Sequence, residues 1–271
     1  MTVGKQTPAI EIDSLSKVYS DRNEEVVAIK EVNLSIPEGK FVSVVGPSGC
    51  GKSTFLHIVG GFIPKTKGTV RIRGKEVDKP GPDRGMMFQE SALFPWKTVS
   101  ENVAWGLEIQ GVPKQERQGI VENYLKLVHL WEFRNHLPSQ LSGGMKQRIS
   151  LARVLAFNPD VLLMDEPFGA LDAQTRENMQ VELQRIWKES QKSVLFVTHD
   201  IDEAVFLSDI VVVFTGRPAV IKEIIEIDFP RPRNLDIHKT KEFTDYRNYI
   251  WDLLHQEHAK PHLKVSEVVN G

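Results

Sequence analysis

The sequence is poor in the features that mark secreted, membrane-spanning or polyanion-binding proteins. Its single cysteine, Cys50, excludes an intramolecular disulfide and is typical of a reducing compartment. Neither the amino-terminal stretch MTVGKQTPAIEID nor any later stretch has an apolar run long enough for a signal peptide or a membrane span. The formal net charge of −2 provides no long-range field that would attract nucleic acid. We therefore expect a cytoplasmic protein that binds no nucleic acid.

The remaining composition is that of an ordinary globular protein, with 41% hydrophobic and 26% charged residues in a chain of 271. Short apolar runs alternate, in the later part of the chain, with helical patterns, which predicts a parallel sheet covered by helices. The runs that predict strands are Ile10–Leu15, Phe41–Val45, Thr69–Ile72, Gly85–Phe88, Val161–Met164, Val194–Val197 and Ile210–Phe214. Between Glu90 and Phe157 helical patterns follow one another, which predicts a helical insertion. After Ile227 only Thr244–His255 is again typical of a helix.

The residues Gly46–Ser53, GPSGCGKS, match the phosphate-binding pattern G-x-x-x-x-G-K-[ST]. They follow the apolar run FVSVV and precede a helical pattern, an order that surrounds phosphate oxygens with backbone N–H groups. We expect Lys52 to contact the β- and γ-phosphates of a nucleotide and the Ser53 hydroxyl to bind Mg²⁺, with Thr54 behind it. Cys50 is expected to be a small filler, because no histidine near it in the sequence could activate its thiol.

Two acidic residues end a buried-strand pattern in Val161–Pro167, VLLMDEP. A carboxylate at the carboxyl end of a core strand is well placed to bind the Mg²⁺ of a nucleotide, and we assign this role to Asp165. Glu166 is then the residue that orients or deprotonates a water for in-line attack on the γ-phosphate. An isolated Asp-Glu pair is more often a solvated helix cap, but the preceding apolar run and the phosphate loop favour the catalytic interpretation.

A third motif, LSGGM, completes an ordered set of motifs that resembles the ATP-binding cassette (ABC) family. In chain order the set comprises Tyr19 in KVYS, Gly46–Ser53, Gln89 in MMFQE, Leu141–Met145, Asp165–Glu166, Ala170–Asp172 and His199 in VTHD. The resemblance covers most of Ile10–Phe214. It implies an α/β protein with a P-loop NTPase (RecA-like) core, an amino-terminal antiparallel β region and an α-helical subdomain inserted at about residues 90–157. We expect the nucleotide-binding domain to span residues 1–230 and a short, partly helical extension to occupy 231–271.

The resemblance also implies a role for each matching residue. Tyr19 would stack on adenine, Gln89 would join the Mg²⁺ and water site, and His199 would contact the γ-phosphate. The catalytic set would be Glu166, His199, Gln89 and Lys52. The residues that contact ATP within one chain would be Tyr19, Gly46, Pro47, Ser48, Gly49, Cys50, Gly51, Lys52, Ser53 and Thr54. The ligands of Mg²⁺ would be Ser53, Gln89 and Asp165.

In this family the LSGGQ-type signature of one subunit caps the ATP that is bound to the phosphate loop of the other. The resemblance therefore implies a second nucleotide-binding subunit, with a homodimer as the expected form. Ser142, Gly143 and Gly144 would reach the partner's γ-phosphate at the amino end of a helix beginning near Met145, and Asp172 would lie at the subunit contact. ATP would hold such a dimer closed and hydrolysis would release it.

A cassette without membrane spans further implies separate transmembrane permease subunits and, for a bacterial-type importer, an extracytoplasmic solute-binding protein. We expect a peripheral ATPase on the cytoplasmic side of the inner membrane. The stretches GPDRGMMFQ, LFPWKTVSENV and LSGGMKQR resemble the subgroup of importers for nitrate, sulfonate, taurine and bicarbonate. Leu93–Trp96, LFPW, either lines the groove that receives the membrane subunit or fills the core of the helical insertion.

Two alternatives stay open, an ABC ATPase of an importer for another small solute and a soluble ABC ATPase outside transport. ABC ATPases that act on chromosomes need a long coiled coil, and no heptad stretch lies between Ser53 and Leu141. Translation-type members carry two cassettes in one chain, whereas this sequence has one. A switch GTPase is expected to carry N-K-x-D, which the sequence lacks.

Overall fold

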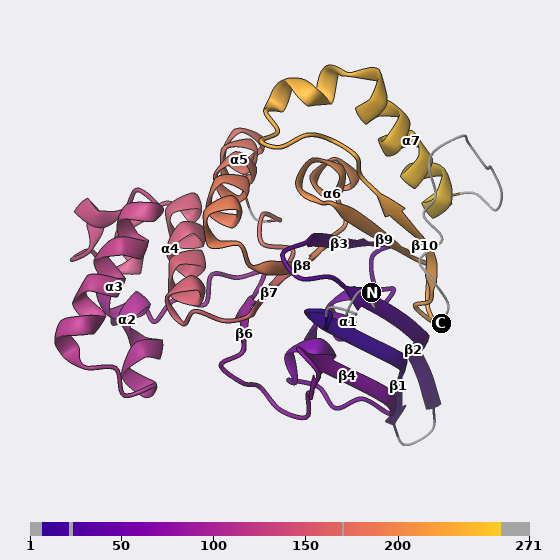
Figure 1. Ribbon diagram of the computed structural model, residues 1–271, viewed down its shortest axis with the longest axis horizontal. Helices are drawn as coiled ribbons and strands as arrows, with labels where there is room; N and C mark the ends of the chain where they lie inside the picture. Colours follow the sequence, from indigo (N-terminus) through magenta and orange to yellow (C-terminus); the bar gives the residue numbers. More distant parts are fainter. Residues whose placement is uncertain (1–6, 22–23, 170, 256–271) are drawn as a thin grey trace, which may run out of the picture. The chain divides into compact units, whose positions relative to one another are not determined.

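The computed structural model describes residues 7–21, 24–169 and 171–255, which form two compact units (Figure 1). The first unit, here called the terminal unit, contains the chain up to Gly81 and the chain from Lys192 onward. The second, the central unit, is Pro82–Gln191. The predicted domain boundary after residue 230 stays a prediction, and residues 256–271 of the predicted extension lie outside the described residues.

An antiparallel sheet forms one part of the terminal unit. Its strands lie in the order β2-β1-β4-β5 and are β1 (Ile10–Asp21), β2 (Glu24–Ile36), β4 (Lys67–Ile72) and β5 (Lys75–Glu76). Ile10 on β1 lies opposite Ile36 on β2 and Ile72 on β4, and all three side chains are buried. The sheet therefore has the one-sided apolar face that is typical of antiparallel strands.

A second group of strands in the terminal unit carries the phosphate loop. Here β3 pairs in parallel with both β8 and β9, and β10 pairs antiparallel with β9. These strands are β3 (Phe41–Val45), β8 (Ser193–Thr198), β9 (Ile210–Phe214) and β10 (Ile221–Glu226). The helices of this unit are α1 (Lys52–Gly60), α6 (Ile201–Leu207) and α7 (Lys241–His255), with the 3-10 turn η3 (Leu235–Lys239). Every residue of β3 and β8 is buried, as expected for parallel strands covered on both faces.

The central unit is mostly helical. It contains the parallel pair β6 (Arg84–Met87) and β7 (Val161–Asp165), the helices α2 (Val99–Ile109), α3 (Lys114–Leu127), α4 (Gly143–Ala156) and α5 (Ala173–Ser190), and the short turns η1 (Trp131–Phe133) and η2 (Pro138–Gln140). Helix α2 packs against both α3 and α4. It begins with a capping box in which the Thr98 hydroxyl accepts the Glu101 N–H and the Glu101 carboxylate accepts the Thr98 N–H.

The predicted α/β class, with its antiparallel β region and helical insertion, is confirmed. Three strands were not predicted, β2, β10 and the two-residue β5. In β2 and β10, charged side chains such as Lys30 and Glu31 interrupt the apolar residues and hide the alternation. The predicted helix Thr244–His255 is present as α7 and begins three residues earlier. Within the described ranges, no helix is long and apolar enough to cross a membrane.

Candidate functional site

The phosphate loop joins strand β3 to helix α1, and its glycines adopt a path that other residues rarely follow. Gly49 has a φ of 74° and Gly51 a φ of 122°. A Cβ added to Gly46 would lie 3.0 Å from the Cys50 sulfur. Among the described residues no side chain caps the amino end of α1, and its first turn contains no acid. A helix amino end without a capping side chain or an acid attracts an anion.

Positive side chains lie against the same loop. The Lys52 ammonium is buried and donates hydrogen bonds to the carbonyls of Gly46 (2.8 Å) and Pro47 (3.1 Å). Arg217 donates to the carbonyl of Gly49 (3.0 Å). Cys50, within the loop, has a buried side chain, and this burial raises the pKa of its thiol. A protonated, enclosed thiol fits the predicted role of Cys50 as a filler.

Tyr19 lies beside the start of α1. Its hydroxyl is 3.5 Å from the Thr54 hydroxyl, and its side chain is 41% exposed. The Lys17 ammonium lies 4.7 Å from the centroid of the Tyr19 ring. An aromatic ring that is partly exposed next to a phosphate loop can stack on the base of a nucleotide held there.

His199 lies between the end of β8 and the start of α6, where hydrogen bonds hold the backbone on both of its sides. The Thr198 hydroxyl accepts the Asp200 N–H (3.0 Å) and donates to the Glu203 carboxylate (2.7 Å). The Asp200 carboxylate in turn accepts the Glu203 N–H (3.1 Å) and caps α6. The position of His199 is thus coupled to the position of helix α6.

A cavity of about 410 Å³ brings the phosphate loop and His199 together in the terminal unit. Gly46, Pro47 and Ser48 form one part of its wall, and His199 and Asp202 form another. The rest includes four residues of α7, which are Arg247, Trp251, Leu254 and His255. The sequence motifs did not indicate these α7 residues, because they follow the last motif and match no pattern of their own.

The catalytic candidates of the central unit gather around Gly169. A Cβ added to Gly169 would lie 3.5 Å from the Gln89 Nε2 and 3.9 Å from a carboxylate oxygen of Glu166. The Gln89 carbonyl accepts a hydrogen bond from Gln147 of α4 (3.1 Å). Asp165 is the last, buried residue of β7, and Glu166 follows it with a φ of 42°. An acid in this rare conformation directly after a buried strand is typical of a functional turn.

The LSGGM signature and the A-L-D turn are neighbours in the central unit. The Ser142 hydroxyl caps α4 by accepting the Met145 N–H (3.3 Å), so the helix begins at Gly143 instead of near Met145 as predicted. Asp172 caps α5 by accepting the Thr175 N–H (3.0 Å), and these hydrogen bonds lower the pKa of its carboxyl. A Cβ added to Gly144 would lie 2.7 Å from Thr175 Cγ2. Of the A-L-D turn, Ala170 lies outside the described residues.

The structure therefore places the predicted residues in two groups, one in each unit. The terminal unit contains Tyr19, the loop Gly46–Ser53 with Thr54, and His199, and the central unit contains Gln89, Ser142, Gly143, Gly144, Asp165, Glu166 and Asp172. The first group has the N–H donors, the ammonium and the aromatic ring that fit a nucleoside triphosphate. The second has the carboxylate and amide oxygens that Mg²⁺ and a reacting water require.

Comparison with known proteins agrees with this chemistry. A family model described as "ABC transporter" matches residues 29–169. The bicarbonate transport ATP-binding protein CmpD of Synechococcus elongatus is 46% identical to this chain, over 93% of this chain and 92% of the relative. The nitrate import ATP-binding protein NrtD of the same species is 43% identical, over 93% of this chain and 94% of the relative.

A solved structure is also similar. It is described as a dimeric post-hydrolysis state of the ATP-binding cassette MJ0796 bound to ADP and Pi. The likeness has a TM-score of 0.72 at 34% sequence identity and covers 82% of this chain and all of the other. The predicted P-loop NTPase core is therefore confirmed at the level of the fold.

Proposed function

Because this chain belongs to the ABC transporter family and hydrolyses ATP, we propose that it is the ATPase subunit of an importer for a small oxyanion such as bicarbonate or nitrate. The similarity to the bicarbonate and nitrate relatives is the observation that supports this solute class, since it extends over 93% of the chain in both cases. Both anions are small, planar and singly charged. Of the other solutes of the predicted subgroup, sulfonate and taurine, the test below includes taurine as the contrasting solute.

For hydrolysis we propose that Lys52 and the loop N–H groups hold the β- and γ-phosphates while Tyr19 stacks on the adenine. Glu166 orients the attacking water and accepts its proton, and His199 contacts the γ-phosphate. These roles require positioning and charge neutralisation more than covalent chemistry, as is general for phosphoryl transfer. Mg²⁺, when bound through Ser53, Gln89 and Asp165, would neutralise charge that develops on the phosphates.

We further propose that a second copy of the chain completes each site. Ser142, Gly143, Gly144 and Asp172 would then act on ATP held by the partner. The dimeric, ADP-bound form of the similar cassette supports this arrangement. Separate permease subunits would receive the movement of the dimer, and a solute-binding protein would deliver the anion from outside. The ATPase would lie on the cytoplasmic side of the membrane.

An uptake assay with a matched inactive variant tests this function. Membrane vesicles are prepared with the chain, the permease subunits that co-purify with it and their solute-binding protein, and are supplied with labelled bicarbonate, nitrate or taurine. We expect ATP-dependent uptake of bicarbonate or nitrate, and no uptake with Glu166→Gln. Uptake of taurine alone would contradict the oxyanion class. Failure of any membrane subunit to co-purify would favour an ABC ATPase outside transport.

A further inference from the structure

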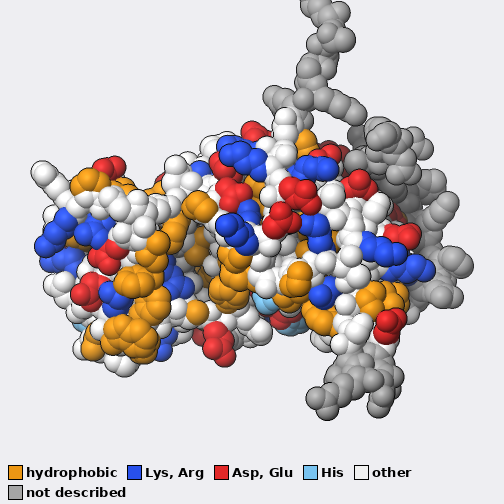
Figure 2. Space-filling view, turned by 90° about the horizontal axis from the view of Figure 1, so that it is seen from below, with side chains coloured by type: hydrophobic (Ala, Val, Ile, Leu, Met, Phe, Trp, Pro, Cys, Tyr) orange, Lys and Arg blue, Asp and Glu red, His pale blue; other side chains and the backbone are white. Residues whose placement is uncertain are grey.

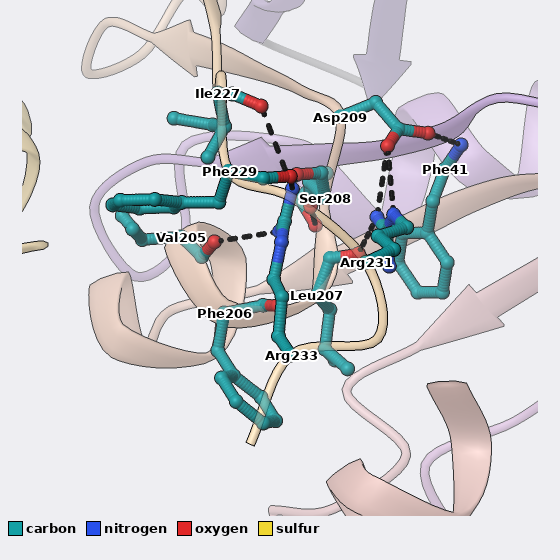
Figure 3. A network of polar contacts seen from close by, with 11 residues as sticks. Phe41, Val205, Phe206, Leu207, Ser208, Asp209, Ile227, Phe229, Arg231 and Arg233 are labelled. Atoms are coloured by element: carbon teal, nitrogen blue, oxygen red, sulfur yellow. Dashed lines mark hydrogen bonds and ion pairs between the residues drawn. The ribbon is translucent and has the colours of Figure 1, made fainter. Parts of the chain in front are cut away.

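Two arginines from the segment after β10 bind the carboxyl end of α6. The Arg233 guanidinium donates to the carbonyls of Val205 (3.1 Å), Phe206 (3.0 Å) and Ser208 (2.8 Å), and Arg231 donates to the carbonyl of Leu207 (2.6 Å) (Figure 3). A helix leaves its last four carbonyls without partners inside the helix, and their partial negative charge attracts cations. Here two guanidinium groups bind four consecutive carbonyls, Val205 to Ser208, at that end.

Arg231 also connects the end of α6 to the strand that precedes the phosphate loop. Arg231 forms an ion pair with Asp209 (2.9 Å), and the other carboxylate oxygen of Asp209 accepts the N–H of Phe41 (2.9 Å), the first residue of β3 (Figure 3). Arg233 is only 4% exposed, and burial lowers its pKa to about 10. It therefore stays charged at neutral pH, and its carbonyl partners compensate for the lost hydration.

Helix α7 and the turn before it cover another side of α6. The His238 ring of η3 packs edge-on against Phe206 of α6, with 5.0 Å between the ring centroids, and stacks on the buried Phe243 of α7 at 4.5 Å. Near the amino end of α6, Asp202 shares the 410 Å³ cavity with Arg247 of α7. The pKa of the Asp202 carboxyl is raised by its burial and by the nearby Asp200, and the charges of Arg247 and His238 offset only part of this shift. The segment thus contacts the carboxyl end of α6 and lines the cavity beside its amino end.

We propose that residues 229–255 act as a clamp that holds α6 and thereby positions His199 beside the phosphate loop for ATP hydrolysis. Arg231, Arg233 and Arg247 are positioning residues in this clamp. The inference rests on the proposed role of His199 in hydrolysis. It follows physically because His199 directly precedes the cap of α6, so that a shift of the helix moves the imidazole, and small displacements of a catalytic group are costly.

The test at the carboxyl end of α6 uses Arg233→Lys in the full-length chain. Lysine keeps the charge but lacks the planar fork that reaches several carbonyls at once. We expect hydrogen exchange of the amides in residues 201–207 to be faster by about tenfold, because the helix opens more readily. We also expect kcat for ATP hydrolysis to fall by about fivefold with the KM for ATP within about twofold of normal. Arg73→Lys, at an exposed ion pair with Glu38, is the control and should change neither.

The test at the amino end of α6 compares substitutions of two exposed cations of α7, Arg247 and Lys241. Arg247→Ala removes the charge that faces the cavity, whereas Lys241→Ala removes one from the first residue of the helix. We expect Arg247→Ala to speed hydrogen exchange of the amides in residues 201–207 and to lower kcat by about threefold, with unchanged ATP affinity and melting temperature. Arg247→Lys should restore most of the rate. This comparison also tests the clamp proposal if Arg233→Lys does not fold.

The outcomes distinguish a failure of the clamp proposal from a failure of the proposed role of His199 in hydrolysis. Unchanged exchange in residues 201–207 for both Arg233→Lys and Arg247→Ala would overturn the clamp, even if the protein hydrolyses ATP normally. Faster exchange with an unchanged kcat would overturn the positioning role. A His199→Ala variant with normal turnover would instead contradict the proposed role of His199, whatever the exchange results.

Discussion

Glu166 combines two features that single it out among the acids of the chain. It directly follows the buried Asp165 at the end of β7, and its φ of 42° lies in a region that non-glycine residues seldom occupy. Its carboxylate and the Gln89 amide flank the same glycine, Gly169. A backbone in this rare conformation, with an acid and an amide beside the same glycine, is expected where a water has to be oriented.

Glu166→Gln keeps the shape of the side chain and removes its ability to accept a proton. We expect kcat for ATP hydrolysis to fall by about 100-fold or more, the range attributed to a general base, while ATP binding is retained. Steady-state ATPase assays and nucleotide titration measure the two effects. Glu177→Gln, at an exposed position of α5, is the control. Turnover of Glu166→Gln close to that of the control would remove Glu166 from the catalytic role.

The two glycines of the signature differ in what surrounds them. A Cβ at Gly143 would meet Leu171 at an ordinary 3.6 Å, whereas a Cβ at Gly144 would lie 2.7 Å from Thr175 Cγ2. Thr175 is β-branched and its N–H binds Asp172, so it cannot move away freely. Gly144 is therefore required for the packing of α4 on α5, in addition to any contact with phosphate.

Alanine substitution should separate these two glycines in thermal unfolding. We expect Gly144→Ala to lower the free energy of unfolding by about 1 to 2 kcal/mol through overpacking. Gly143→Ala should leave it unchanged or raise it, because alanine favours the helix by up to about 1 kcal/mol. Equal melting temperatures for the two variants would contradict the steric argument.

At the scale of elements, the packing of helix α2 requires a residue without a side chain where α2 meets the end of α4. A Cβ at Gly106 would overlap the ring of Phe157, the residue that directly follows α4 as its C-cap. In α3, by contrast, a Cβ at Gly119 would have nothing within 4 Å. The two glycines therefore form a matched pair in neighbouring helices, one required by packing and one exposed.

We expect Gly106→Ala to destabilise the protein by about 1 to 3 kcal/mol, because the ring of Phe157 has to be displaced. Gly119→Ala should stabilise it by up to about 1 kcal/mol, since alanine is the better helix former. Denaturant unfolding of both variants measures the difference. A Gly106→Ala variant as stable as Gly119→Ala would show that α2 and α4 are not packed as described.

The segment before α2 contains Trp96, for which the sequence left two roles open, core filling and a contact groove for the membrane subunit. Asn102 is fully buried, and its side chain accepts the Phe94 N–H (2.8 Å) and donates to the carbonyls of Lys97 and Thr98 (both 3.0 Å). It holds a turn in which Trp96 is 72% exposed. Figure 2 shows hydrophobic side chains gathered on the lobe that carries α2 and α3. For Trp96, core filling is thus excluded, and a contact surface stays the prediction.

At the scale of the whole molecule, the signature is expected to act on a second chain. Ser142→Arg places a long cation at the amino end of α4, in the central unit, and leaves the sequence of the phosphate loop Gly46–Ser53 unchanged. We expect the isolated chain to bind ATP normally while cooperative ATP hydrolysis is lost, as measured by nucleotide titration and by the dependence of rate on protein concentration. Gln115→Arg, exposed on α3, is the control. Loss of ATP binding by Ser142→Arg would mean that the signature acts within one chain.

Local patterns were sufficient for much of this description. The loop Gly46–Ser53 was predicted from a strand, small residues and a helix in immediate succession, an order that is visible without knowledge of distant residues. The same holds for Asp165 and Glu166 after their buried strand. Strand β2, by contrast, was not predicted. Its buried face forms against its partner β1, and the spacing of the residues in β2 does not reveal this pairing.

What the sequence alone determined is therefore the set of short-range motifs, their chemistry and the class of fold, since each depends on neighbouring residues. Only the tertiary structure decided which residues far apart in the chain act together. Arg231 and Arg233 belong to no motif, yet they bind the carbonyls at the end of α6. Residues of α7 line the same cavity as Gly46 and His199. The physical reason is that a buried guanidinium is stable only where several acceptors converge, and convergence is a property of the folded chain.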